Sequence, residues 1–241
     1  MTSANQTASN GRPSVAGVVL ARTDSSRLPG KVLTPVLGRP VVGYVFERAA
    51  KASGLRGLAL ATTDRPADDE LARYAASLGV PVFRGDVDDV AGRVLACAED
   101  LGVDYALRLN GDSPFLDPHL IEQGLELLAE NPDVVTSVRG KTFPYGVSVE
   151  IVRVAALAQA HQLMTPDERE HVTAHFYRNA DRYRISELTS PAPELAAARM
   201  VVDNEDDLRA FEAVIAQLGD DALSADFRRV APYYLELGRL R

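Results

Sequence analysis

The amino-acid sequence predicts an α/β fold with a doubly wound, mostly parallel sheet. Short apolar runs rich in β-branched residues alternate with longer helical stretches, which is the pattern of strands joined by helices through right-handed crossovers. Several of these runs are followed directly by glycine and charged residues, as happens where the strands of such a sheet end at a ligand site. From about residue 133 the alternation changes, which predicts a small α+β insertion.

The elements of the first half follow one another in a regular order. Val15–Leu20 is a short apolar run bounded by polar residues, which is typical of a buried strand. Gly38-Arg39-Pro40 then opens a helix, because proline suits the first helical turn. The elements expected from here to residue 129 are helix 41–52, strand 58–62, helix 66–78, strand 81–83, helix 89–101, strand 105–109 and helix 118–129.

The second half holds the insertion, at about 140–190, which we expect to close over the substrate or to form a dimer contact. A returning core strand at 199–202 and a helix ending near residue 218 then complete a single domain, 15–241. Residues 1–14 are polar and lack the apolar segment of a signal peptide, so they predict a disordered lead-in. The other elements expected here are strands 134–138, 147–152 and 184–188, helices 154–163 and 167–180, and a terminal helix in 224–241.

Composition and charge exclude several classes of protein. Hydrophobic residues make up 46% of the chain, but no run approaches the ~20 apolar residues that cross a bilayer, so we expect no membrane partner. The net charge of −8 argues against a nucleic-acid partner, which a basic stripe would mark. The single cysteine, Cys97, lies in an apolar helical stretch, so packing is its expected role. Without a disulfide framework or an export signal, the sequence predicts a cytoplasmic protein.

A cationic loop follows the first strand. Arg22, Arg27 and Lys31 stand close together in an otherwise acidic protein. A triphosphate carries about four negative charges, and arginine forks and a lysine point charge suit its oxygens and a departing pyrophosphate. The loop lacks the Walker A and G-x-G-x-x-G patterns, and the alternative is a solvated basic loop. The remaining loop residues assigned to the same site are Ala21, Ser25, Ser26 and Gly30, of which the serines and the glycine leave backbone amides free to face phosphate.

Two aspartates that directly follow strands predict a magnesium site. Asp112 lies in a turn between Gly111 and Pro114, and Asp203 ends the returning strand. Magnesium prefers a few carboxylates together with water and phosphate oxygens, so two aspartates at neighbouring strand ends, facing a triphosphate loop, suit it. Alternatively, Asp112 caps its turn and Asp203 caps the following helix. Further aspartates at strand ends, expected either to meet a base or ribose or to be solvated turn residues, are Asp64, Asp86 and Asp89.

The first loop, with Arg22, Arg27 and Leu28-Pro29-Gly30-Lys31, resembles the N-terminal signature of the bacterial cytidylyltransferases that activate sugar acids. These include acylneuraminate and deoxy-octulosonate cytidylyltransferases, and the likeness is closest to their spore-coat polysaccharide branch. It spans about residues 15–215. Further stretches fit the family in the same order: Gly38-Arg39-Pro40, Ala61-Thr62-Thr63-Asp64, Phe83-Arg84-Gly85-Asp86 with Asp89-Val90 and Arg93, Arg108-Leu109-Asn110-Gly111-Asp112-Ser113-Pro114, Pro144-Tyr145-Gly146 with Val149-Glu150, Arg169-Glu170-His171-Val172-Thr173, and 199–203 with Asp207-Leu208.

The resemblance implies a Rossmann-like nucleotidyltransferase domain, similar to the GT-A fold, and a role for each matching residue. Arg22, Arg27 and Lys31 would hold the CTP phosphates, with Lys31 countering charge on the departing pyrophosphate. Asp112 and Asp203 would bind Mg²⁺, and Asp112 is a candidate general base, ahead of His171. The residues assigned to the nucleotide are Thr63, Asp64, Arg84, Asp89, Arg93, Arg108 and Gly111. Those assigned to the acceptor are Tyr145, Glu150, Glu170 and His171, for which a solvated strand end and an exposed helix surface are the alternatives.

The implied function is transfer of CMP from CTP to an acidic acceptor with release of pyrophosphate. A nonulosonic or octulosonic sugar acid is the expected acceptor, and a phosphonate or another small acid is the alternative. A GT-A glycosyltransferase is disfavoured because Asp112 is not part of an Asp-x-Asp, and a non-catalytic nucleotide-binding module is disfavoured by the cationic loop and paired aspartates together. The segment 143–183 suggests a homodimer. Asp24 departs from the family, and it would repel a triphosphate unless it faces away or touches magnesium.

Overall fold

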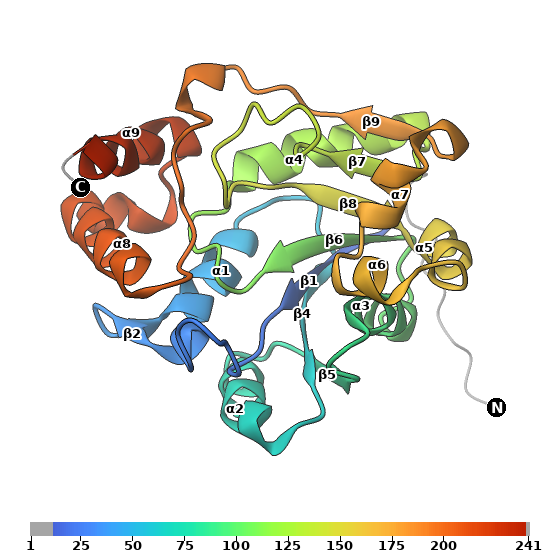
Figure 1. Cartoon of the computed structure of the whole chain (residues 1–241), viewed down its shortest axis with the longest axis horizontal. Coiled ribbons are helices and arrows are strands. Elements are labelled where there is room, and N and C mark those ends of the chain that lie inside the picture. Colours follow the sequence, from blue (N-terminus) through green and yellow to red (C-terminus); the bar gives the residue numbers. More distant parts are fainter. Residues whose placement is uncertain (1–11, 240–241) are drawn as a thin grey trace.

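The computed structural model of the chain describes residues 12–239 (Figure 1). Most of the expected lead-in, residues 1–11, lies outside the described residues. Ser14 is held in place, because its backbone N–H and its hydroxyl both donate to Asp104 Oδ2 at 2.8 Å. The first strand of the main sheet begins directly after this contact.

One seven-stranded sheet runs through the described part of the chain in the order β5-β4-β1-β6-β8-β7-β9. The first four strands are parallel, β8 is antiparallel to both of its neighbours, and β9 is parallel to β7. The doubly wound, mostly parallel sheet expected from the sequence is therefore confirmed. The bounds of its strands are β1 Val15–Leu20, β4 Gly57–Thr63, β5 Val82–Gly85, β6 Tyr105–Asn110, β7 Val134–Thr136, β8 Glu150–Arg153 and β9 Ile185–Glu187.

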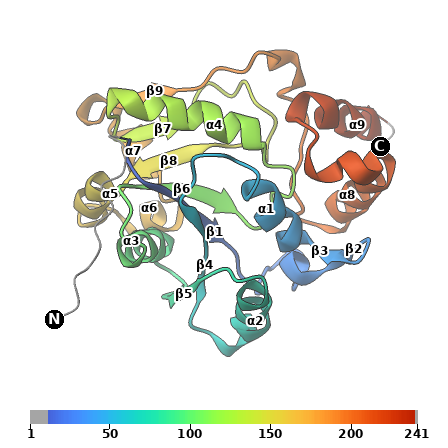
Figure 2. The same ribbon diagram turned by 180° about the vertical axis from the view of Figure 1, so that it is seen from behind.

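Helices cover both faces of this sheet (Figures 1 and 2). Val18 and Val19 of β1 are both fully buried and point into two different hydrophobic clusters, so this strand is enclosed on both sides. The helices of the first cluster are α1 Val41–Ala49, α2 Asp69–Ser77, α4 Pro118–Glu126, α8 Glu205–Leu218 and α9 Phe227–Arg239. Those on the opposite face are α3 Val90–Asp100, α5 Val154–His161, α6 Pro166–Glu170 and α7 Ala174–Arg178.

Short elements connect these layers. A two-stranded hairpin of β2, Pro35–Val36, and β3, Arg39–Pro40, precedes α1, so the helix begins one residue after the proline that signals it. Cys97 on α3 is 1% exposed, which confirms its packing role. The 3-10 helices are η1 Lys31–Leu33, η2 Pro66–Asp68, η3 Leu127–Glu130, η4 Ala180–Arg182, η5 Pro193–Leu195 and η6 Gly219–Leu223.

Three expected elements of the second half differ from the structure. Met200, Val201 and Val202 are buried but belong to no strand of the sheet, and the exposed Arg199 makes only an isolated bridge to Tyr145. The strand expected at 147–152 begins at Glu150. The helix expected at 167–180 is two short helices, because Val172 between them is fully buried with φ of 32°, which an α-helix cannot contain.

The segment 140–190 contributes β8, which lies between β6 and β7, and the edge strand β9 to the main sheet, and it places α5 and α6 against α3. Its strands thus extend the core sheet. None of the helices among residues 12–239 has the length and apolarity needed to cross a membrane.

Arg48 of α1 joins distant parts of the first face. Its guanidinium is fully buried and donates to the carbonyl oxygens of Leu116, Ala222 and Ala225 at 2.8, 2.7 and 2.6 Å. One side chain therefore ties α1 to the turn before α4 and to the connection between α8 and α9. Burial lowers the pKa of Arg48 to about 10, against the opposing effect of Asp117 and Asp226, so it stays charged at neutral pH.

Candidate active site

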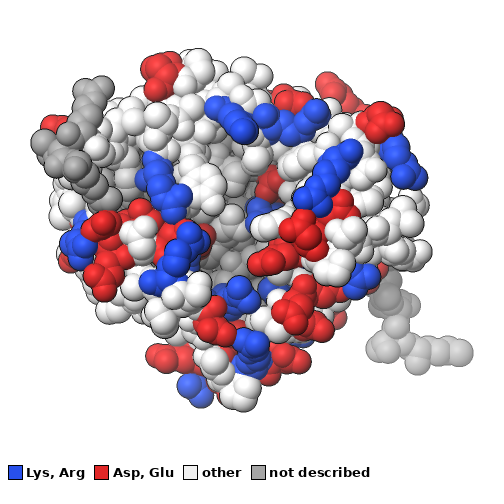
Figure 3. All heavy atoms as spheres, in the orientation of Figure 1, with Lys and Arg blue, Asp and Glu red and all other residues white. Residues whose placement is uncertain are grey.

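A cleft of about 1470 Å³ opens at the carboxyl ends of β1 and β6. The loop that follows β1, the segment 137–148 and the segment 166–177 form its walls. The space-filling view shows a hollow in the middle of one face with Lys, Arg, Asp and Glu side chains gathered around it (Figure 3). Parallel sheets bind ligands at this edge.

The loop after β1 closes on itself and turns Lys31 into the cleft. The carbonyl oxygen of Thr23 accepts hydrogen bonds from the backbone N–H of Ser25 at 3.0 Å and of Gly30 at 2.8 Å. Gly30 has φ of 73°, a conformation that favours glycine, and η1 begins at the next residue. Ala21, Arg22, Ser25, Ser26 and Arg27 line the cleft beside Lys31, as the sequence predicts for a phosphate loop.

Lys31 joins the two aspartates that the sequence assigns to magnesium. Its ammonium nitrogen lies 2.7 Å from Asp112 Oδ2 and 2.8 Å from Asp203 Oδ1. Arg27 and Arg199 reach the other oxygen of Asp203 at 2.6 and 3.0 Å. Burial alone would raise the pKa of Asp203, but these three cations outweigh it and hold the pKa below its ordinary value.

The donor set fits a magnesium ion. The carboxylates of Asp112 and Asp203 lie on either side of the Lys31 ammonium, and both aspartates line the cleft. Within residues 12–239, no cluster of three or more His, Cys, Asp or Glu side chains is suited to a metal ion. Mg²⁺ needs no such cluster, because it takes one or two carboxylates and fills its octahedron with water and phosphate oxygens. Asp112 and Asp203 are thus the residues that would hold it.

Asp68 holds the loop after β1 in place through Thr23. It is 1% exposed, and its Oδ1 accepts hydrogen bonds from the backbone N–H and the hydroxyl of Thr23, both at 2.7 Å, while its Oδ2 accepts one from Thr63. Burial would raise the pKa of Asp68, but these donors lower it below its usual range. Asp24 faces Arg65, 2.6 Å away, so its charge is paired at the rim of the cleft.

Arg93 lies on the other side of the loop. Its guanidinium donates to the carbonyl oxygens of Asp86 and Val87, and its Nε has no hydrogen-bond partner within the described chain. Burial and then the charge of Arg22 lower the pKa of Arg93. The arginine lines the cleft and holds the 86–88 turn in place, with its Nε buried.

Several residues that the sequence assigns to the nucleotide do not line the cleft. Arg84 ties α2 to β4 through Asp69 and the carbonyl oxygens of Thr63 and Arg65. Asp89 is the N-cap of α3 and also contacts His161 and Arg169. At Gly111, a side chain would meet Ala21 Cβ at 2.5 Å, so this glycine allows the ends of β1 and β6 to approach. The assigned residues outside the cleft are Gly30, Thr63, Asp64, Arg84, Asp89 and Gly111.

All four residues assigned to the acceptor line the far wall of the same cleft. Tyr145 is 62% exposed and stacks under the guanidinium of Arg199, 5.0 Å from its ring centroid. Glu150 is buried and bonded to Arg108. The sequence assigned no role to several further polar residues that line the cleft, among them Asn110, Lys141, Thr173 and Tyr177. The four-residue spacing of Thr173 and Tyr177 is the signal that places those two on one face of a helix.

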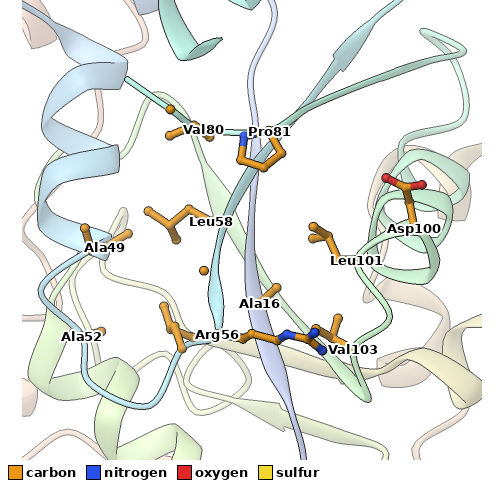
Figure 4. A pocket seen from close by; sticks show the side chains of 14 residues that line it. Ala16, Ala49, Ala52, Arg56, Leu58, Val80, Pro81, Asp100, Leu101 and Val103 are labelled. Atoms are coloured by element: carbon orange, nitrogen blue, oxygen red, sulfur yellow. The ribbon is translucent and has the colours of Figure 1, made fainter. Parts of the chain in front are cut away.

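A second cavity, of about 630 Å³, lies where the strands begin rather than where they end (Figure 4). Alanine, leucine, valine and proline side chains surround most of it, with Arg56 and Asp100 at its margins. None of the residues assigned to the site lines this cavity. The charged cleft is therefore the candidate active site.

Comparisons with known proteins agree with this geometry. The model of the cytidylyltransferase family matches residues 16–234. The spore coat polysaccharide biosynthesis protein SpsF of Bacillus subtilis is 27% identical over 213 residues, which cover 84% of this chain and 87% of that protein. The 8-amino-3,8-dideoxy-manno-octulosonate cytidylyltransferase of Shewanella amazonensis is 38% identical over 120 residues, 48% of this chain and 47% of that protein.

A solved structure of a cytidylyltransferase from Leptospira borgpetersenii has the same fold. It superposes with a TM-score of 0.83 at 25% sequence identity and covers 95% of this chain and 94% of its own. The resemblance noted in the sequence and the nucleotidyltransferase fold it implied are confirmed. The chain belongs to the cytidylyltransferase family and is a CTP-dependent nucleotidyltransferase.

Proposed function

We propose that the protein transfers CMP from CTP to a nonulosonic or octulosonic sugar acid, with Mg²⁺ as cofactor. The observation that carries this proposal is the cluster of Lys31, Asp112 and Asp203 at the phosphate loop. The cluster supplies the two charges that the reaction needs, a cation for departing pyrophosphate and carboxylates for a metal. The similarity to the Shewanella amazonensis enzyme, which is named for an octulosonate, supports a sugar acid as acceptor.

In this reaction an acceptor oxygen attacks the α-phosphorus of CTP in line. The bond from that phosphorus to the oxygen bridging to the β-phosphorus breaks, and pyrophosphate leaves. Arg22 and Arg27 at the cleft wall bind phosphate oxygens, and Lys31 neutralises charge that develops on the leaving group. A bound Mg²⁺ would add neutralising charge on the phosphates. Asp112 engages Lys31 through one oxygen, and it is our candidate to accept the proton of the attacking hydroxyl.

The direct test is pyrophosphate release from CTP, ATP, GTP and UTP with Mg²⁺ against a panel of sugar acids and phosphonates. Of the four nucleotides, we expect only CTP to give pyrophosphate release, and only when a sugar acid is present. If CTP gives release with a phosphonate but with no sugar acid, the reaction stands and the acceptor is a phosphonate. If no acceptor gives release and CTP does not bind in a titration, the proposed function is wrong.

We further propose that the protein is a cytoplasmic homodimer whose partner contacts the segment 140–190. Exposed apolar side chains on and around this segment support the contact, because Val138, Tyr145 and Leu163 are 39%, 62% and 58% exposed. Size-exclusion chromatography with light scattering measures the oligomeric state. A monomer at assay concentration, with full activity, would contradict the dimer.

A further inference from the structure

A row of polar side chains crosses three neighbouring strands on the acceptor side of the cleft. Arg108 of β6 is the register partner of Glu150 of β8, which is in turn the partner of Thr136 of β7. Register partners in adjacent strands point to the same face of the sheet. The three side chains therefore lie side by side beneath the segment 166–177.

Glu150 has its hydrogen-bonding capacity occupied from within the protein. Its Oε2 accepts from Arg108 Nη1 at 2.6 Å, and its Oε1 accepts from the hydroxyls of Thr173 and Tyr177, both at 2.6 Å. Tyr177 also contacts the Thr136 hydroxyl at 2.8 Å. The carboxylate is 4% exposed, so it is enclosed by donors and fixed in one orientation. It acts on a ligand through Arg108 and not by direct contact.

Arg108 keeps donors free. Only its Nη1 bonds within the described chain, its Nε is buried without a partner, and its side chain is 19% exposed and lines the cleft. An arginine that is held rigidly by one carboxylate presents the N–H groups of its Nη atoms in a fixed plane. These groups can bind a second carboxylate, whereas the buried Nε of Arg108 is closed to solvent.

The position of Arg108 separates it from the phosphate loop. Arg22 and Arg93 belong to the loop after β1 and to α3, whereas Arg108 faces β8, on the side where Tyr145, Glu170 and His171 line the wall. Arg108 is flanked by Val18 of β1 on one side and by Glu150 of β8 on the other, and its ion pair is made on the β8 side. A ligand bound to Arg108 on that side lies toward the acceptor wall.

We propose that Arg108 is the anchor for the acceptor's carboxylate and that Glu150, fixed by Thr173 and Tyr177, is the positioning residue that aims it. This inference rests on the proposed function. The acceptor class that fits is a monoanion. Glu150 already offsets the charge of Arg108, so the pair carries no excess positive charge and binds a carboxylate mainly through the direction of its N–H groups. A dianionic phosphonate would gain less from this pair. Arg108 thus selects the acceptor and does not bind the nucleotide.

The test compares wild-type protein with Arg108→Gln, Arg108→Lys and Tyr177→Phe in steady-state pyrophosphate release, with a separate CTP titration. We expect Arg108→Gln to raise the acceptor KM about 10- to 100-fold, as loss of a charge-assisted contact does, while the Kd for CTP stays unchanged. Arg108→Lys keeps the charge without the fork, so it should rescue part of the loss. Tyr177→Phe loosens Glu150 and should raise the acceptor KM by a smaller factor with kcat retained.

Arg56→Gln is the matched control, because Arg56 makes one long bond, 3.3 Å to the carbonyl oxygen of Gly102, far from the cleft. If Arg108→Gln fails to fold because Glu150 is left as a buried unpaired charge, the double variant Arg108→Gln/Glu150→Gln removes both charges and takes its place. An unchanged acceptor KM, or a weakened Kd for CTP, overturns the inference while the proposed function stands. No release from wild-type protein with any acceptor, together with no binding of CTP in the titration, overturns both.

Discussion

Lys31 and Asp203 form a buried ion pair, with Nζ 2.8 Å from Oδ1, although 172 residues separate them in the sequence. Their side chains are 8% and 11% exposed. The same ammonium is bonded to Asp112, so a single lysine joins the start of η1 to the end of β6 and to the segment just before α8. The loop after β1 is thereby held against both aspartates without a ligand, which is the preorganisation that electrostatic catalysis requires of a site for phosphate.

Replacing Lys31 should impair chemistry, while Arg27 and Arg199 still pair with Asp203 in the variant and support the fold. We expect Lys31→Ala to lower kcat for pyrophosphate release by about 10²- to 10³-fold, the usual cost of losing one group that stabilises developing charge. The exposed Lys51 after α1 provides the control, and Lys51→Ala should behave as wild type. Thermal unfolding of both variants checks that they are folded. A folded Lys31→Ala protein with unchanged kcat would show that the leaving group is neutralised by other residues.

Metal removal should separate activity from stability. We expect chelation with EDTA to abolish pyrophosphate release, and Mg²⁺ to restore it, because two carboxylates and the phosphate oxygens form the expected site. The unfolding midpoint of the nucleotide-free protein should not move, since Lys31, Arg27 and Arg199 already neutralise Asp203 and Asp112 without metal. A large drop in the midpoint on chelation would instead indicate a structural metal.

The sequence carries enough information for elements that local patterning determines. Val15–Leu20 is predicted to the residue, because an apolar β-branched run bounded by polar residues has few other structures available. Met200, Val201 and Val202 also form a short apolar run and are also buried, yet the segment 199–202 pairs with a loop and not with the sheet. The apolar residues predict burial in both cases. Whether a buried segment joins the sheet depends on which chain segment lies beside it, and local sequence does not contain this information.

The candidate site likewise has features that local sequence predicts and features that depend on the tertiary structure. Residue types and strand ends predicted Lys31, Asp112 and Asp203 as a group, but the bonds among them depend on strand order, which local sequence does not contain. Arg84 was assigned to the nucleotide from its motif. In the structure its guanidinium donates to Thr63 of β4 and to Asp69 of α2. The support of Glu150 by Thr173 and Tyr177 needed the register of β6, β8 and β7 to become visible.

Arg48 should be one of the residues on which stability depends most. In Arg48→Met the apolar part of the side chain remains, but three buried carbonyl oxygens lose their donors. A buried acceptor left unpaired costs about 1–3 kcal/mol, so we expect the variant to lose about 3 kcal/mol or more of unfolding free energy. Urea denaturation measures the loss, with Arg56→Met as a control that should remain close to wild type. A loss equal to that of the control would mean that water replaces the guanidinium.

Glu168 gives the protein a specific acid sensitivity. The carboxylate accepts a hydrogen bond from the backbone N–H of Thr165, and His175 and Arg178 lie at 3.2 and 3.3 Å. The Thr165 bond and these partners, against the effect of burial, lower the pKa of Glu168 to about 2 from its ordinary 4.5. Because the folded pKa lies below the unfolded one, the charged group stabilises the fold above pH 4.5, and this contribution is lost as the pH falls toward 2.

The variant Glu168→Gln isolates this effect, because its amide oxygen can still accept from Thr165 but carries no charge. Wild-type protein should be more stable than the variant at pH 6, and the difference in unfolding free energy should shrink steadily below pH 4.5. Urea denaturation of both proteins across this range gives the difference directly, and acid effects from all other carboxylates cancel in it. A difference that stays constant with pH would mean that Glu168 contributes through packing and neutral hydrogen bonds, with no depressed pKa in the folded state.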